Sequence, residues 1–486
     1  MRRAPLPASG IGLTRPRLPT PHLGATVALG ALAAAVGAIA AVQPLALALP
    51  IAAALLVALA FLAPVTQLTL LLVTTAVIGD TLQRQVTGHL LLSDALLLTG
   101  LFRAGVVSLG QRIEPRRLAV AALAVTFMAA VLLQLVHGLH TGSDPSYAAA
   151  EARALVGFGA LIVAMPIVAD PLGRKRLARA LALVGLLLGV WGLLQWALGI
   201  TGGDSLGFGL RSGSDSVLAG KGQLHGGLYG YPVAVVMSAG VLLTGVRSVP
   251  ARLFLFIVFL TNLACLLLTY ERTFWLTTII GVAFVIAKAG PGRRFRAAVS
   301  ALAVGVLLLG VMAIAAPAAV TALRERVVSL GHTSTSDSVR WRVVETQHLI
   351  DQKLKPRPLL GWGLGNFLHW GQPWLQVRPR STWFAHNGYL WMVWKTGVFV
   401  TALLLALLGW AVLARGAPEG GDFMRVFRNA SQGGLLTLLL SSVTFPSFNS
   451  VAITAVMGVL MAVCFAPQKP GCAQMRDDNA RRTSRA

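Results

Sequence analysis

A single histidine stands where a long loop of charged and aromatic residues gives way to an apolar segment. His386 lies in residues 383–390 (WFAHNGYL), and the sequence is then largely apolar to residue 414. A histidine takes up a proton near neutral pH, so a histidine fixed at this boundary could deprotonate an incoming hydroxyl group. The alternative is that His386 is only a polar residue at the start of a helix.

An arginine lies at a second boundary between apolar segments. Glu271 and Arg272 separate two such segments with almost no loop, which places the guanidinium near a membrane interface. An ionisable residue in that position is a candidate for function, and arginine binds phosphate groups through two parallel hydrogen bonds. The alternative is an arginine that ends a helix and extends its charged group into water.

Aromatic residues surround His386, and two interpretations of them stay open. Trp383, Phe384, Tyr389, Trp391 and Trp394 could form the aromatic belt of a membrane protein at the water interface, or a platform on which sugar rings stack. The nine histidines are scattered and show no ligand spacing. The sequence therefore predicts no metal site and no cofactor.

The composition defines the elements that must position these residues. Hydrophobic residues make up 56% of the 486 residues, charged residues 12%, and the mean hydropathy is +0.73. A soluble domain usually has about 25% charged residues, and a disordered chain lacks long apolar runs. The fold class expected is therefore all-α, a polytopic membrane protein with about 12–14 transmembrane helices.

The spans are expected where roughly 20 mostly apolar residues follow one another. They cover residues 24–42, 44–63, 65–79, 89–107, 118–137, 148–169, 178–200, 226–246, 252–270, 273–289, 297–316, 386–414, 432–446 and 450–466. The third and the last two are short. About eleven helices thus precede one large loop at 317–385, and the remaining ones follow it.

Basic residues predict the orientation of these spans, because short cytoplasmic loops are rich in Lys and Arg. The net charge is +24. Every connecting segment that lies on the same side of the membrane as the N-terminus contains several basic residues. Residues 1–23 and 467–486 are therefore expected to be cytoplasmic tails. The charge indicates membrane topology and not nucleic-acid binding, and the large loop lies on the outer face.

The large outer loop contradicts the charge rule that the other loops follow. Residues 317–385 contain nine Lys and Arg against four Asp and Glu. An excess of positive charge at the outer surface suggests that the loop binds an anionic ligand. The alternative is a solvated loop whose charge has no function.

Several motifs in order resemble a known family. They are Arg272 at a span boundary, an outer loop with Arg340 and Arg342, residues 358–367 (PLLGWGLGNF), and residues 386–390 (HNGYL) opening a span. The alternating glycines permit tight backbone turns. This combination resembles the O-antigen ligase and polymerase superfamily.

The resemblance implies an activity. Members are metal-independent glycosyltransferases of the GT-C type at the outer face of the inner membrane. They transfer a glycan from an undecaprenyl-diphosphate carrier to an acceptor, which is a glycan, a lipid or a protein. By the resemblance we expect an O-antigen ligase-like enzyme of the cell envelope, working in the bilayer with inversion at the anomeric carbon.

The resemblance also implies roles for residues. His386 would activate the acceptor hydroxyl. Arg272 would bind the donor diphosphate, with Glu271 where the family has serine. Further donor ligands would be Arg340 or Arg342, and either Arg211 or Lys221 before residues 226–232 (GGLYGYP). The candidates for acceptor and glycan contacts are Trp383, Asn387, Tyr389, Gly363 and Asn366.

Other functions stay open at this point. A polymerase or a protein O-oligosaccharyltransferase of the same family would use the same residues. A solute transporter would use polar residues within the membrane, as Asp94 in span 89–107 suggests, although inverted repeats are not apparent. A scaffold for envelope assembly would use the large loop for docking and would tolerate the loss of His386.

Overall fold

The computed structural model describes part of the chain. The described residues are 59, 61–78, 92–109, 114–198, 210–212, 222–224, 229–244, 248–289, 294, 310, 321, 324, 337–372, 377–415 and 421–467. All of them belong to the unit Leu59–Ala486. The expected span 24–42, nearly all of span 297–316, most of span 44–63, the N-terminal tail and nearly all of the C-terminal tail lie outside the described residues.

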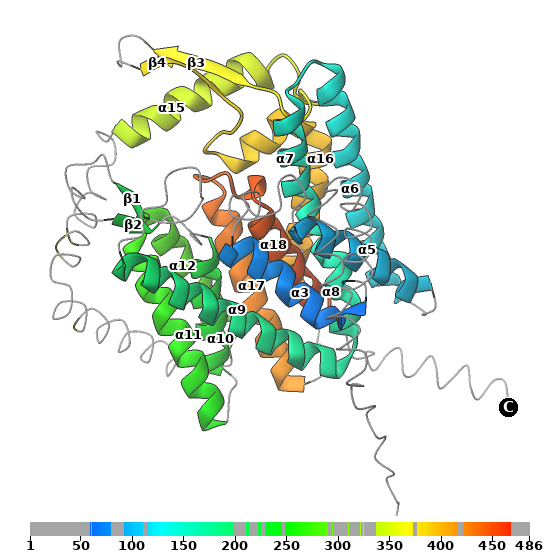
Figure 1. The fold of residues 1–486 in the computed structure, drawn as a ribbon, viewed down its shortest axis with the longest axis vertical. Helices are drawn as coiled ribbons and strands as arrows, with labels where there is room; N and C mark the ends of the chain where they lie inside the picture. Colours follow the sequence, from blue (N-terminus) through cyan, green and yellow to red (C-terminus); the bar gives the residue numbers. More distant parts are fainter. Residues whose placement is uncertain are drawn as a thin grey trace, which may run out of the picture. The chain divides into compact units, whose positions relative to one another are not determined.

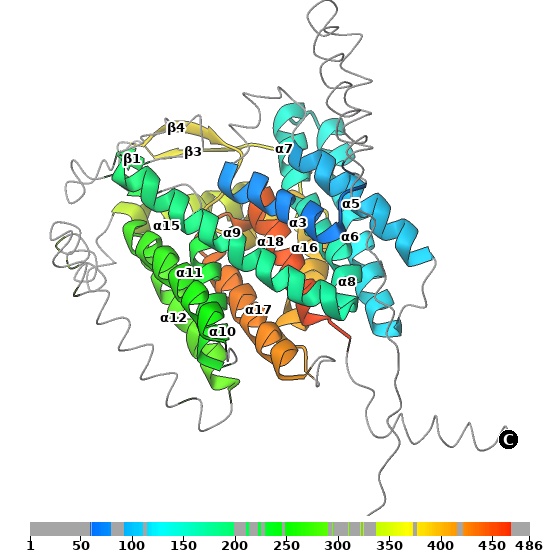
Figure 2. The same cartoon turned by 60° about the horizontal axis from the view of Figure 1, so that its bottom comes forward.

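The described residues are mostly helical, which confirms the all-α fold class. The helices are α3 (Pro64–Val73), α5 (Leu92–Leu109), α6 (Pro115–His140), α7 (Pro145–Val156), α8 (Ala160–Ala169), α9 (Pro171–Ala197), α10 (Gly230–Thr244), α11 (Val249–Leu268), α12 (Arg272–Ala287), α15 (Asp337–Leu349), α16 (Gly388–Leu413), α17 (Gly421–Ser441) and α18 (Val451–Cys464). Figures 1 and 2 show how they pack, with α18 among α3, α8, α16 and α17.

Several helices are long and apolar enough to cross a membrane. Among the described residues, five segments meet that criterion, namely α6, α7 continued by α8, α9, α11 and α16. Four shorter apolar helices accompany them. The chain is therefore an integral membrane protein, while the expected total of 12–14 spans stays a prediction.

Helix α17 begins earlier than the expected span 432–446. It starts at Gly421, and its first half carries Asp422, Arg425 and Arg428. These charges lower the local hydropathy, so a search for apolar runs finds only the second half of the helix. Their side chains nonetheless fit the helix, because Arg425 pairs with Asp422 at 2.5 Å across one turn.

Proline and short polar side chains fix where many helices begin. Pro115, Pro145 and Pro171 occupy the first turn of α6, α7 and α9, where proline's missing N–H needs no partner. Asp144 caps α7 by accepting hydrogen bonds from the backbone of Ser146 and Tyr147. The hydrogen bond from the Ser146 side chain contributes most to lowering the pKa of Asp144, so this cap stays ionised at neutral pH.

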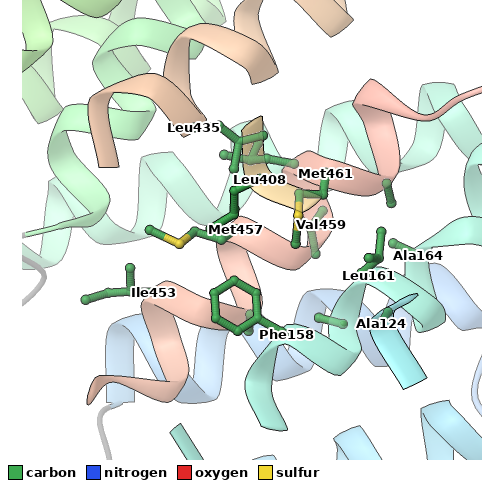
Figure 3. Close-up of a cluster of buried hydrophobic side chains, with 14 of the residues drawn as sticks. Ala124, Phe158, Leu161, Ala164, Leu408, Leu435, Ile453, Met457, Val459 and Met461 are labelled. Carbon is green, nitrogen blue, oxygen red and sulfur yellow. The ribbon is translucent and has the colours of Figure 1, made fainter. Parts of the chain in front are cut away.

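The core is built around α18 (Figure 3). Phe158, Leu161, Leu408, Leu435 and Met457 are buried and lie together in this cluster. Gly458 of α18 faces the backbone of α8, where an added Cβ would lie 2.8 Å from the Leu161 nitrogen. Small residues at such crossings let helix backbones approach closely.

Helix α16 has a kink, and the loop of residues 358–363 fills it. Gly397 has φ 79° and ψ 169° within the helix. The loop supplies hydrogen-bond partners for the backbone groups of α16 at the kink. Trp362 N–H donates to Trp394 O at 2.9 Å, and Val398 N–H donates to Pro358 O at 2.9 Å. The kink is thus caused by an inserted segment, which fixes the loop to the helix that follows His386.

The region between α12 and α16 contains ordered elements that position the site. Helix α15 is followed by a π-helical turn, Ile350–Leu354. Strands β3 (Leu368–Gln372) and β4 (Val377–Thr382) form an antiparallel hairpin that pairs Leu368 with Thr382. Figure 1 shows α15 and this hairpin next to each other near the start of α16. A second small hairpin joins β1 (Leu210–Ser212) and β2 (Gly222–Leu224).

Candidate functional site at the start of helix α16

His386 lies directly before α16, in a short stretch that the helix cap holds in place. Asn387 is the cap, and its Oδ1 accepts hydrogen bonds from the backbone of Tyr389 at 3.1 Å and Leu390 at 3.0 Å. Gly388 N–H donates to Ser442 O at 2.8 Å, which ties this turn to the end of α17. The His386 side chain is 41% exposed, so reactants can reach it.

Glu345 of α15 is the partner of His386. Its Oε2 lies 2.9 Å from His386 Nδ1 and accepts the His386 backbone N–H at 3.1 Å. The Glu345 side chain is only 4% exposed. The sequence gives no sign of this residue, because the two lie 41 positions apart and only the folding of the region before α16 brings them together.

The pairing determines which imidazole nitrogen can act as a base. When Glu345 is ionised its oxygens can only accept hydrogen bonds, and Nδ1 then carries the proton that it donates to Glu345. In the neutral ring the lone pair is then on Nε2. Within the described part of the chain, Nε2 has no hydrogen-bond partner. This arrangement of acid, imidazole and free nitrogen is that of an oriented general base.

Arg342 lies on the same helix as Glu345, one turn earlier. Its guanidinium carbon is 5.5 Å from the ring centre of Phe445. Phe445 stacks on Phe274 with 4.6 Å between ring centres, and Tyr229 meets Phe274 edge to face at 5.2 Å. Helix α15 therefore joins the histidine to the start of α10 and α12.

Arg272 is the first residue of α12, two positions before Phe274. The turn that precedes it is unusual: Tyr270 has φ 52°, the left-handed region that residues other than glycine rarely adopt. Such strain often accompanies functional sites. The N-terminus of a helix carries partial positive charge, so the guanidinium and the α12 N-terminus together favour an anion here.

The other predicted donor ligands are less well placed by the structure. Arg340 lies in α15 and Arg211 in β1, opposite Gln223, but their side chains are outside the description. Lys221 lies outside the described residues. The fold therefore links Arg272 and Arg342 through the Phe274–Phe445 stack, and the roles of the other three stay predictions.

Of the predicted acceptor contacts, the aromatic residues Trp383 and Tyr389 each lie three positions from His386 in the chain. Trp383 packs against Tyr147 with 5.3 Å between ring centres, and its backbone oxygen accepts a hydrogen bond from Trp391 Nε1 at 3.2 Å. The Tyr389 hydroxyl donates to Leu439 O at 2.5 Å. Both side chains are half-buried. Both have structural partners, and the aromatic ring that contacts His386 itself is that of Phe384, 5.6 Å between ring centres.

Asn366 lies at the centre of a polar network beneath the loop. Its Oδ1 accepts hydrogen bonds from Lys353 Nζ at 2.8 Å and Trp394 Nε1 at 3.1 Å, and its backbone oxygen accepts one from Lys395 Nζ at 2.6 Å. Burial lowers the pKa of Lys353. The ring of Trp362, whose centre is 4.6 Å from Lys353 Nζ, stabilises the charged ammonium group.

A buried ion pair, also missed from the sequence, anchors this network. Glu151 of α7 and Lys395 of α16 are both completely buried, with 2.6 Å between Nζ and Oε1. Glu151 Oε2 accepts the Gly365 N–H at 2.7 Å. The sequence does contain a sign of this pair, because Glu151 and Lys395 are charged residues inside predicted spans and have opposite charges.

The glycines of residues 361–365 adopt the conformation that their spacing suggested. Gly361, Gly363 and Gly365 have φ values of 70°, 81° and 78°. Gly363 lies directly against the backbone of Gly138 in α6, which leaves no room for a side chain. These positions therefore require glycine, and they pack the loop against α6, α7 and α16.

Gly363→Ala is expected to destabilise the protein by about 1–3 kcal/mol, because the new methyl group would overlap the Gly138 backbone and the left-handed conformation disfavours alanine. The free energy of unfolding in mixed micelles measures this. Gly409→Ala, in a helical position with open space around it, serves as the control and should not destabilise. Equal effects of the two changes would contradict the assigned packing.

Two further observations concern the other functions considered. Asp94, which favoured a transporter, pairs with Arg153 of α7 at 2.8 Å, so a structural ion pair accounts for its charge. Among the described residues, no group of three or more His, Cys, Asp or Glu is arranged to hold a metal ion.

The fold and the site define an integral membrane protein with a buried polar network and an oriented histidine at one end of its helices. Residues 254–405 match the family model described as O-antigen ligase. This match confirms the predicted resemblance to the O-antigen ligase and polymerase superfamily over that part of the chain, and it supports a membrane enzyme of the ligase or polymerase type in general. The matched residues include Arg272, Arg342, Glu345 and His386. A search of curated proteins found no match.

Proposed function

We propose that this protein transfers a glycan from an undecaprenyl-diphosphate carrier to an acceptor hydroxyl at the outer face of the inner membrane. The observation that carries the proposal is the His386–Glu345 pair, 2.9 Å apart, in which Glu345 lies on the same helix as Arg342. An oriented imidazole beside cations suits a reaction in which a hydroxyl attacks a carbon that bears a diphosphate.

In the proposed reaction, the acceptor oxygen forms a bond to the anomeric carbon of the donor glycan. The hydroxyl proton moves to His386 Nε2, and the bond between the anomeric carbon and the diphosphate oxygen breaks. The electron pair leaves with undecaprenyl diphosphate. Since attack and departure occur on opposite sides of the carbon, the anomeric configuration is inverted.

The arginines would stabilise the leaving group. Arg272, at the positive end of α12, is the proposed main ligand of the diphosphate, and Arg342 the second. Guanidinium groups keep their charge at neutral pH and bind phosphate oxygens in pairs, so they can neutralise the developing charge without a metal ion. Arg340, Arg211 and Lys221 are further proposed donor contacts.

The acceptor would approach from the side of the loop and the hairpin. Trp383 and Tyr389, each three positions from His386 in the chain, are the proposed residues for stacking against sugar rings. We assign Gly363, Asn366 and Asn387 to this side because they shape the loop and the turn that carries the histidine. In the proposed topology both termini are cytoplasmic and residues 317–385 lie outside, so the reaction takes place in the extracytoplasmic space.

The proposal is tested with purified protein in nanodiscs, supplied with an undecaprenyl-diphosphate-linked oligosaccharide and alternative acceptors. Release of undecaprenyl diphosphate together with a new glycosidic bond would support it, and the acceptor used would distinguish ligase, polymerase and protein O-oligosaccharyltransferase. If no donor and acceptor react and a solute flux appears in proteoliposomes, the transporter interpretation replaces it.

Arg272→Lys is expected to reduce transfer at least about tenfold, because a charge-assisted hydrogen bond to phosphate contributes ~1.5–3 kcal/mol and lysine lacks the paired geometry. The measurement is the initial rate of undecaprenyl diphosphate release. Arg357→Lys is the matched control, since Arg357 is exposed and lies over the Trp362 ring, 4.5 Å away. An unchanged rate for Arg272→Lys would exclude it as a phosphate ligand.

A further inference from the structure

A cavity lies away from His386, between α3, α9, α10, α11, α17 and α18. Its volume is about 550 Å³, a size typical of small-molecule sites. Figure 2 shows α9 running past α10, α11 and α18, which border the cavity. Most of the lining is aliphatic or aromatic, for example Leu188, Val233, Met237 and Phe427.

The charges of the cavity are confined to one end. Lys175 and Arg179 line it, one turn apart near the start of α9, and both are exposed. Within the described part of the chain neither has a hydrogen-bond or ion-pair partner. None of the residues that line the cavity is acidic. The cavity is thus an apolar space with two available cations at its mouth.

The hydroxyl hydrogen of Ser238, which also lines the cavity, is already used within the protein. Ser238 donates its hydroxyl hydrogen to Ala234 O at 2.5 Å within its own helix. Along α9 the lining extends from Lys175 to Leu188, about 20 Å at 1.5 Å per residue. One leaflet of a bilayer is roughly 15 Å of hydrocarbon, so the length suits one set of acyl chains.

We propose that this cavity binds one anionic phospholipid, with its headgroup phosphate at Lys175 and Arg179 and its acyl chains between α9, α10 and α17. Basic residues at the mouth of a pocket between membrane helices are suited to anionic headgroups. In the predicted orientation this is the cytoplasmic leaflet. The site is separate from the proposed glycan transfer, whose diphosphate ligands lie at the opposite end of the helices.

The test uses native mass spectrometry on the full protein, stripped of lipid and then mixed with phosphatidylglycerol or phosphatidylcholine. We expect a retained phosphatidylglycerol molecule and much weaker retention of phosphatidylcholine. Lys175→Ala combined with Arg179→Ala should weaken phosphatidylglycerol binding about 30-fold. Arg176→Ala is the matched control, because Arg176 is exposed on the same helix but does not line the cavity.

A second variant distinguishes binding of the lipid inside the cavity from non-specific attraction of an anionic lipid to the protein surface. Ala182→Phe places an aromatic ring within the lining and keeps both cations, so it should also abolish retention of phosphatidylglycerol. Size-exclusion elution checks that each variant is folded. Equal binding of the two lipids, an equal effect of Arg176→Ala, or full retention by Ala182→Phe would overturn the proposal. It would also be overturned if undecaprenyl phosphate displaced phosphatidylglycerol preferentially, since the cavity would then serve the donor.

Discussion

Replacing His386 with alanine is expected to reduce glycan transfer by about 10²–10⁴-fold, the usual contribution of a general base. The physical reason is that the acceptor hydroxyl would have to lose its proton to water while it attacks. The donor should still bind, because the proposed phosphate ligands are on other helices. The measurement is transfer under saturating donor, with the donor KM determined separately.

The control for this prediction is His369→Ala. His369 is exposed in β3, where its Nδ1 lies 2.7 Å from Ser381 Oγ, so its loss should change the rate by no more than about twofold. Membrane insertion of the His386 variant must equal that of the wild type. Full activity of His386→Ala would show that His386 is not the general base, and a scaffold would then be the better interpretation of the protein.

Glu345→Gln examines the same pair from the other side. Glutamine keeps the size of the side chain and can still accept the His386 backbone N–H, but its amide could also donate to Nδ1 and place the proton on Nε2. A positioning role predicts a loss in kcat that is smaller than for His386→Ala, with the donor KM unchanged. A purely structural role predicts that Glu345→Gln lowers stability and leaves kcat unaffected.

Breaking the Glu151–Lys395 pair is expected to lower the free energy of unfolding by about 3–5 kcal/mol, because either single change leaves a buried charge without its partner. Glu151→Gln and Lys395→Met are the two variants. Both residues are completely buried, so water cannot solvate the remaining charge. Unfolding in mixed micelles measures the effect.

The double variant and a surface pair provide the controls. Glu151→Gln combined with Lys395→Met removes both charges, so it should destabilise less than the two single changes added together. Lys355→Ala breaks an exposed pair with Asp351 of similar length, 2.7 Å, and should cost at most about 1 kcal/mol. If the buried and the exposed pair gave equal effects, Glu151 and Lys395 would not anchor the loop.

The residues of the candidate site fall into two groups by how they could be found. His386 and Arg272 are visible in the sequence because each lies where an apolar segment begins, and hydropathy marks that point directly. Glu345 is one of four acidic residues in a loop that contains nine basic residues. Only the packing of α15 against the start of α16 distinguishes it from the others.

The sequence by itself determined the class of fold, because the apolar runs must be helical in a bilayer, where each backbone polar group needs an internal partner. The alternating glycines of residues 361–365 permitted tight turns, and the structure shows that these residues adopt them. The tertiary structure decided which distant residues meet: Glu345 with His386, Glu151 with Lys395, and Arg342 with the aromatic residues beside Arg272. Such pairings depend on how helices pack, and hydropathy does not contain that information.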